Sequence, residues 1–215
     1  AIDAVAGDSR FAPLLALDKV GMYGMSAGGH TALSLAGGRW SPAQFRRHCE
    51  AHIADDFNTC VGLATRLRDN LLDGAKKSIA VAIIRQRFGD ETWQTHDDPR
   101  IRAVVAGVPA AADFDPASLA TPRVALGLVT AGHDKWLVPR FHSDVVLKAC
   151  APRCALIAHL PTAGHGALLS PPPPWDRLGE IALDLLGDPP GFDRALLPEV
   201  DRKIVTFLRR HLLPT

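Results

Sequence analysis

Four short apolar runs in the chain predict buried β-strands. They span residues 19–23, 102–108, 123–130 and 155–160, and each is rich in Val, Leu, Ile or Ala. Apolar and polar positions alternate little within them, as expected for strands that are covered on both faces. We therefore expect a parallel sheet with helices on its two sides.

Helical patterns lie between and after these runs, at 28–37, 42–52, 75–88, 139–150, 175–186 and 198–212. A strand followed by a helix, repeated along a chain, is typical of α/β folds with right-handed crossovers. The last pattern places Val200, Ile204 and Phe207 on one side, which predicts an amphipathic packing helix. The prolines at 171–174 and the turn cluster at 187–191 predict surface loops.

Length and composition favour one globular domain over residues 1–215. The chain is 47% apolar and 22% charged, and it is shorter than the roughly 250 residues at which cores usually divide. Its net charge of +1 and the lack of a long basic run argue against nucleic-acid binding. No apolar stretch reaches the ~18 residues of a membrane span, so we expect none.

Four cysteines, Cys49, Cys60, Cys150 and Cys154, are grouped in two local pairs. Pairing within each group is the simplest of the three possible connectivities, and four buried free thiols are the alternative. Disulfides would indicate an oxidising compartment, so the expected location is periplasmic or secreted, with a cytoplasmic location as the alternative. The first ten residues do not resemble a signal peptide, and the absence of an initiator Met fits a processed or truncated chain.

The segment at 24–28, Gly-Met-Ser-Ala-Gly, follows the first predicted strand and precedes a helix. A serine nucleophile needs such a strained strand-to-helix turn, with its hydroxyl exposed above the sheet edge. Gly24 and Gly28 would flank Ser26 because a side chain at either position would collide with the strand or the helix. The Ala27 N–H is the expected oxyanion donor. The alternative is a tight turn with a capping serine.

A serine hydroxyl also needs a general base and a carboxylate that orients it. His165 follows the last predicted strand and lies between glycines, which suit a mobile and exposed imidazole. Asp134 follows the preceding strand, in the expected order of serine, acid and histidine. A solvated loop histidine and a turn aspartate are the alternatives. Asp113 is the substitute acid, and Asp144, inside a predicted helix, is less favoured.

Other polar residues carry weaker signals. His48 and His52 are one helical turn apart, next to Cys49 and upstream of Asp55 and Asp56, so a metal site is conceivable. These residues do not form a recognisable ligand framework, and we predict neither a metal nor another cofactor.

Aromatic and histidine side chains near the predicted acid are candidates for substrate binding. His133 neighbours Asp134 and would line a pocket, and Trp136 and Trp175 with the proline run would wall an apolar substrate cleft. Packing alone explains these residues equally well. His30, on the helix behind the serine, is expected to pack.

These motifs together resemble a known group. The chain is similar, over nearly its whole length, to α/β-hydrolases described as predicted dienelactone hydrolases, which are related to platelet-activating factor acetylhydrolases. The resemblance rests on the residues at 24–33, 98–105, 131–134, 138–139 and 163–165. It implies ester hydrolysis through an acyl-enzyme with Ser26, Asp134 and His165 as the triad. Dienelactone hydrolases proper use a cysteine where this chain has Ser26, which argues against a dienelactone substrate.

The sequence departs from this fold at its front. The strand before the nucleophile normally comes fifth and lies mid-sheet, whereas only residues 1–18 precede it here. A second oxyanion donor normally follows one of the earlier strands, and losing one donor costs ~10²–10³ in rate. We therefore expect either the C-terminal portion of a longer protein or an incomplete oxyanion hole. The strand at 19–23 would then form a sheet edge, open to pairing with a second copy.

The function expected from the sequence is hydrolysis of a small-molecule carboxylic ester by a serine esterase. The alternative is a catalytically incomplete relative that acts as a binding module or needs a missing N-terminal part. Acyl transfer to an alcohol other than water would use the same three residues.

Overall fold

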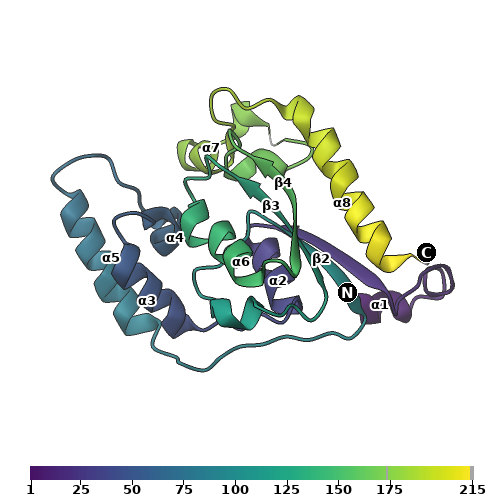
Figure 1. The fold of residues 1–215 in the computed structure, drawn as a ribbon. Helices are drawn as coiled ribbons and strands as arrows, with labels where there is room; N and C mark the ends of the chain where they lie inside the picture. Colours follow the sequence, from purple (N-terminus) through teal and green to yellow (C-terminus); the bar gives the residue numbers. More distant parts are fainter. Residues whose placement is uncertain (173, 214–215) are drawn as a thin grey trace.

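A four-stranded parallel sheet forms the centre of the protein, with the strands side by side in chain order. The computed structural model describes residues 1–172 and 174–213. Its strands are β1 (Val20–Met25), β2 (Ile101–Gly107), β3 (Ala125–Ala131) and β4 (Cys154–Leu160). The sequence-based prediction of an α/β fold with a parallel sheet is confirmed, and each strand lies within about two residues of its expected place (Figure 1).

Helices connect and cover these strands. They are α1 (Ile2–Ala6), α2 (Ala27–Leu35), α3 (Pro42–His52), α4 (Phe57–Val61), α5 (Asp73–Arg87), α6 (Ser143–Cys150), α7 (Glu180–Leu186) and α8 (Leu197–Leu212). The helix expected at 139–150 is broken at His142, whose backbone leaves the helical region. The helix expected at 175–186 is likewise divided into a short 3₁₀ turn, Trp175–Arg177, and α7.

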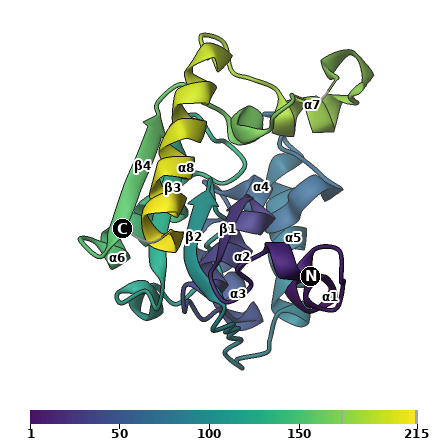
Figure 2. The same ribbon diagram turned by 90° about the vertical axis from the view of Figure 1, so that its right-hand side faces the viewer.

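The two faces of the sheet carry different helices. On one face, Val104 of β2 packs in a core with Leu33 of α2 and Val146 of α6. On the other face, Val105 packs in a second core with Ile204 of α8. Neighbouring residues of β2 thus point to opposite cores, as the two-residue period of a strand requires. Figure 2 shows α8 lying across its face of the sheet, and the expectation of helices on both faces is confirmed.

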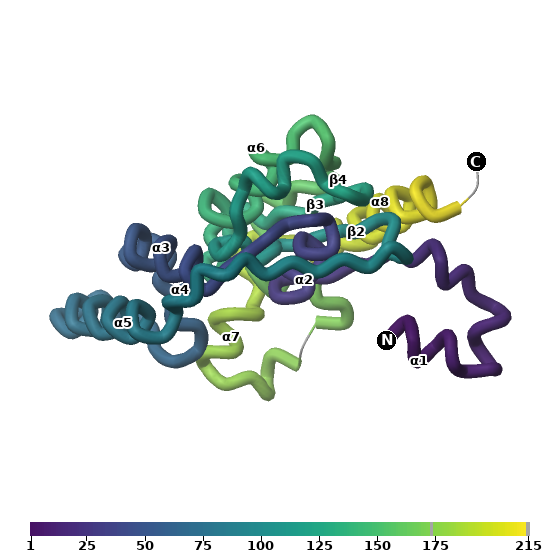
Figure 3. The backbone as a smooth tube through the Cα atoms, turned by 90° about the horizontal axis from the view of Figure 1, so that it is seen from below, coloured from purple at the N-terminus to yellow at the C-terminus, as the bar shows by residue number. Residues whose placement is uncertain are grey.

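The segment between α2 and β2 forms a helical excursion, which we call the α3–α5 unit (residues 42–87). It lies beyond the end of the sheet, on the side away from α8 (Figures 1 and 3). Its small core contains Cys49, Cys60 and Ile84, with Phe45 and Phe88 packed against them.

Two disulfides staple local structure, and the predicted pairing is confirmed. Cys49–Cys60 joins α3 to α4 within the α3–α5 unit. Cys150–Cys154 joins the end of α6 to the start of β4. The two disulfides weakly fit an extracellular or otherwise oxidising environment.

Two further expectations concern the surface. No helix within the described ranges is long and apolar enough to cross a membrane. Pro171, Pro172 and Pro174 of the predicted proline loop lie outside regular secondary structure, and Pro173 lies outside the described residues.

Candidate active site

Ser26 occupies a strained turn between β1 and α2. Its backbone φ of 56° and ψ of −115° lie in a region that residues other than glycine rarely adopt. The Ser26 N–H donates to the Gly107 carbonyl (3.0 Å), and the Ser26 carbonyl accepts from His30 N–H (3.0 Å) and Ala110 N–H (3.2 Å). Such strain persists only where the surroundings enforce it, and these three hydrogen bonds do so here.

The glycines around Ser26 are required by close backbone approaches, though not all at the expected places. A Cβ on Gly24 would overlap the Gly28 carbonyl, as predicted. The prediction for Gly28 is wrong, because a Cβ there would meet nothing within 4 Å. The second close approach is instead at Gly29, where a Cβ would lie 2.7 Å from the Cα of Pro109. Pro109 belongs to the loop that follows β2, so this loop braces the start of α2.

His165 contacts both Ser26 and Asp134. Its Nε2 lies 2.9 Å from Ser26 Oγ, and its Nδ1 lies 2.7 Å from Asp134 Oδ2. The expectation of an exposed imidazole is wrong, because His165 is only 6% exposed. The flanking glycines serve packing instead: a Cβ on Gly164 would meet Pro189 at 2.9 Å, and one on Gly166 would overlap the backbone of Leu186.

Asp134 is buried, and both of its carboxylate oxygens are satisfied. Oδ1 accepts hydrogen bonds from Trp136 N–H (2.9 Å) and Leu137 N–H (2.8 Å), while Oδ2 faces His165. Because an ionised carboxylate is only an acceptor, the proton between Asp134 and His165 resides on Nδ1. Nε2 is then the lone-pair nitrogen and faces the Ser26 hydroxyl. This arrangement can withdraw a proton from Ser26 and stabilise the resulting imidazolium.

The substitute acids have other positions. Asp113 lies 2.9 Å from His30 Nε2, and the His30 ring packs against Trp40 and Phe114. His30 therefore packs as expected. Asp144 is exposed on α6.

Ala27 is the first residue of α2, directly after Ser26, and it is exposed. The first N–H groups of an α-helix have no acceptor within the helix. The Ala27 N–H is therefore available to an oxygen that develops negative charge beside Ser26.

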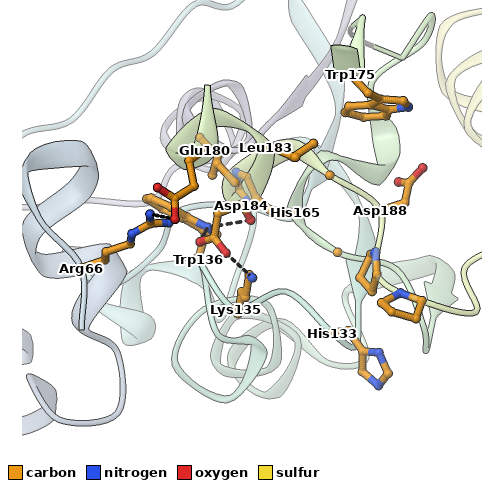
Figure 4. A pocket seen from close by; sticks show the side chains of 15 residues that line it. Arg66, His133, Lys135, Trp136, His165, Trp175, Glu180, Leu183, Asp184 and Asp188 are labelled. Carbon is orange, nitrogen blue, oxygen red and sulfur yellow. Dashed lines mark hydrogen bonds and ion pairs between the residues drawn. The ribbon is translucent and has the colours of Figure 1, made fainter. Parts of the chain in front are cut away.

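A pocket of about 680 Å³ opens beside His165 (Figure 4). His133 and Trp136 line it, as does Trp175. The Trp136 indole N–H lies 3.1 Å from both the backbone carbonyl and a carboxylate oxygen of Asp184 on α7. Trp136 thus connects the loop that carries Asp134 to the helix on the other side of the pocket.

Two ion pairs span the same pocket. Lys135 Nζ lies 2.5 Å from Asp184, and Arg66 of the α3–α5 unit contacts Glu180 at the start of α7. Each positive wall residue therefore faces a negative one, and a third acidic wall residue, Asp188, is paired with Arg194. No sequence signal predicts the four residues of the two spanning ion pairs, because they come from three segments that meet only in the folded chain.

A second polar cluster lies buried between the α3–α5 unit and α6. Asp56 Oδ2 lies 2.7 Å from His48 Nε2 and 3.2 Å from His142 Nε2, and Asp56 Oδ1 lies 2.9 Å from Thr59 Oγ1. Burial of Asp56 acts to raise its pKa, but hydrogen bonds from His142, His48 and Thr59 outweigh it and hold the pKa well below the ordinary value.

The weak metal hypothesis fits this region poorly. Cys49 is bonded to Cys60, so it has no thiolate to offer. His48 is bonded to Asp56, and His52 stacks on Phe141. Across residues 1–172 and 174–213, no three His, Cys, Asp or Glu side chains form a group that could hold a metal ion.

No family model, curated protein or solved structure matches this chain. Function is therefore inferred from the geometry of the site.

Proposed function

We propose that the protein is a serine hydrolase that cleaves carboxylic esters through an acyl-enzyme, with Ser26, His165 and Asp134 as its catalytic triad. One observation carries the proposal: a serine held at positive φ has its hydroxyl 2.9 Å from a buried imidazole, whose other nitrogen lies 2.7 Å from a buried carboxylate. These are the contacts that nucleophilic catalysis by serine needs.

In the proposed mechanism, Ser26 Oγ attacks the ester carbonyl while His165 Nε2 takes its proton. Asp134 holds the imidazole in the required tautomer and stabilises the cation that forms. The Ala27 N–H donates to the oxyanion. His165 then gives the proton to the leaving alcohol, and a water molecule, activated by the same imidazole, releases the acyl group. An alcohol in place of this water would give acyl transfer instead.

The pocket beside His165 is the proposed binding place for part of the ester. Trp136 and Trp175 offer apolar surface, and the charged wall residues are ion-paired, with no excess positive charge to hold an anion. We therefore propose an uncharged, small to medium ester as the substrate. His133, also on the pocket wall, is a proposed contact of that ester.

The same proposal places the chain in the α/β-hydrolase superfamily, with β1 and α2 as its nucleophile elbow. The two disulfides support a periplasmic or secreted location. Pairing of two copies through the free side of β1, which lies at one edge of the sheet, is a compatible assembly.

Fluorophosphonate labelling with peptide mapping tests the nucleophile. Labelling is expected at Ser26, and it should disappear in Ser26→Ala and fall steeply in His165→Gln. A label on another residue, or a label that survives Ser26→Ala, refutes the proposal. Turnover of p-nitrophenyl acetate by this chain then separates an active esterase from a catalytically incomplete binding module.

A further inference from the structure

We propose that Asp56, Thr59 and His142 form a positioning network that fixes the backbone around the active site. This inference rests on the proposed function of Ser26. None of the three residues contacts Ser26, His165 or Asp134 through a side-chain hydrogen bond in the structure. They act through two branches of hydrogen bonds that end at the proposed triad.

The first branch runs from Thr59 to the acid. Thr59 Oγ1 lies 2.8 Å from the carbonyl oxygen of Trp136. Trp136 N–H donates to Asp134 Oδ1 at 2.9 Å. Both backbone polar groups of Trp136 are thus engaged, one by the network and one by the carboxylate that orients His165. Losing the Thr59 contact frees the loop on which the Asp134 carboxylate depends.

The second branch runs from His142 to the nucleophile. His142 Nδ1 accepts the N–H of Ala111 at 2.9 Å, which fixes the loop after β2. The neighbouring Ala110 N–H donates to the carbonyl of Ser26 at 3.2 Å. Because His142 Nδ1 is an acceptor, its proton is on Nε2, where it points to Asp56 and Thr59.

Asp56 joins the two branches. Its side chain is fully buried: Oδ2 lies within hydrogen-bonding distance of His48 and His142, and Oδ1 shares the single Thr59 hydroxyl proton with the Trp136 carbonyl. A buried charge is rarely the most stabilising choice, since well-packed apolar residues often serve stability as well or better. A carboxylate can, however, accept several directed hydrogen bonds at once. The need to orient the Thr59 and His142 side chains explains the buried Asp56 carboxylate better than a contribution to stability does.

The Cys49–Cys60 disulfide holds the network from outside. Cys49 directly follows His48, and Cys60 directly follows Thr59. The disulfide therefore holds α3 and α4 together next to His48 and Thr59, the residues through which the network extends toward the sheet. Through it the α3–α5 unit has a role in the site, although it supplies none of the proposed triad.

Thr59→Val tests the first branch because it replaces the hydroxyl by a methyl group and keeps the shape of the side chain. Misplaced catalytic groups lose rate rather than affinity, so kcat should fall about 10-fold while KM stays within about 2-fold. Thr59→Ser, which restores the hydroxyl, should recover most of kcat. Thr59→Ala gives the same readout if Thr59→Val does not fold, because it adds no methyl group beside the Asp56 carboxylate.

Thr130→Val is the matched control. Thr130 is a buried threonine in β3 whose Oγ1 lies 2.7 Å from His159 Nδ1, so its replacement also breaks a side-chain hydrogen bond. It should lower the midpoint of thermal unfolding without changing kcat. A folded Thr59→Val or Thr59→Ala that keeps kcat within about 2-fold of the wild type overturns the network.

Ser26-dependent turnover by the wild type is measured first, because its absence would refute the proposed function and not the network. The network then has its own readout in the proton NMR signal of His165 Nδ1–H, identified by its loss in His165→Gln. This signal should shift or broaden in Thr59→Val and stay in place in Thr130→Val. An unchanged signal in Thr59→Val overturns the network whether or not the protein turns over an ester.

Discussion

Asp134→Asn is the sharpest test of the proposed acid, because the structure fixes how the new amide must lie. The carboxylate accepts three hydrogen bonds, two on Oδ1 from backbone N–H groups and one on Oδ2 from His165. Asparagine has one acceptor oxygen. The two backbone donors cannot turn away, so they take the oxygen, and the amide NH₂ is left facing His165 Nδ1.

This arrangement forces the wrong histidine tautomer. Nδ1 must accept from the amide, so the proton moves to Nε2, which then faces Ser26 Oγ at 2.9 Å with no lone pair to take a proton. Loss of the base in this way costs about 10⁴-fold in kcat, which corresponds to about 5 kcal/mol of transition-state stabilisation. The fold should change little, because the amide occupies the same volume.

The assay is steady-state hydrolysis of p-nitrophenyl acetate, with circular dichroism to confirm folding. Asp113→Asn is the matched control, since Asp113 pairs with His30 in a similar way at 2.9 Å and lies outside the proposed triad. The control should keep kcat within about 3-fold of the wild type. If Asp134→Asn retains a tenth of the activity, or if both variants lose activity alike, Asp134 is not the acid.

Three further predictions concern stability. Gly24→Ala should destabilise the protein by about 2 kcal/mol or more, because its methyl group overlaps the Gly28 backbone. Gly28→Ala should be neutral or stabilising, because a Cβ there meets no other atom. Urea titrations that reverse this order of stability contradict the packing described. Replacing both Cys49 and Cys60 by alanine should cost about 3 kcal/mol of unfolding free energy, as expected for a cross-link between residues 11 apart, and an unchanged urea midpoint would argue against that disulfide. The lowered pKa of Asp56 means that its ionised form stabilises the fold at neutral pH and that this contribution is lost as the pH falls below the ordinary aspartate range. Between pH 6 and pH 3 the unfolding free energy of the wild type should therefore fall by about 1 kcal/mol more than that of Asp56→Asn. Equal falls in parallel urea titrations would show that Asp56 is not held ionised.

Local signals in the sequence were sufficient for the sheet and most helices. The predicted bounds of α3 agree with the structure at both ends. Its start is marked in the sequence by Ser41 and Pro42. Ser41 Oγ accepts from Gln44 N–H at 3.1 Å, which is the usual role of a serine before a helix. Where a nonlocal contact intervenes, the prediction was less accurate: the helix expected from residue 139 breaks at His142, whose ring is held in the buried network.

The candidate site divides in the same way. The Gly-x-Ser-x-Gly motif predicts Ser26, and positions after predicted strands predict Asp134 and His165; the structure brings the three within hydrogen-bonding distance. His133, Trp136 and Trp175 line the pocket as expected, but its charged walls could not be predicted. Arg66 and Asp184 come from segments more than a hundred residues apart, and nothing in either segment indicates the other.

Pairing of histidine with aspartate does not by itself identify the site, because the described chain contains several such pairs. At 2.7 to 3.2 Å, the distances of these pairs do not single out His165. The ring nitrogens do: Asp113 faces His30 Nε2, Asp56 faces His48 Nε2 and His142 Nε2, and Asp134 faces His165 Nδ1.

In the pairs made by Asp113 and Asp56 the carboxylate faces Nε2, the nitrogen at the tip of the ring. In His165 the carboxylate takes Nδ1, and the tip nitrogen is left to face the hydroxyl of a serine whose backbone is strained. A turn of that kind costs of order 1–3 kcal/mol, which a mere capping serine would not require. The choice of ring nitrogen leaves a lone pair beside the Ser26 hydroxyl, and the strain at Ser26 is an independent feature of the same site. Their coincidence at one point of the sheet edge is the strongest physical argument that this point is built for nucleophilic chemistry.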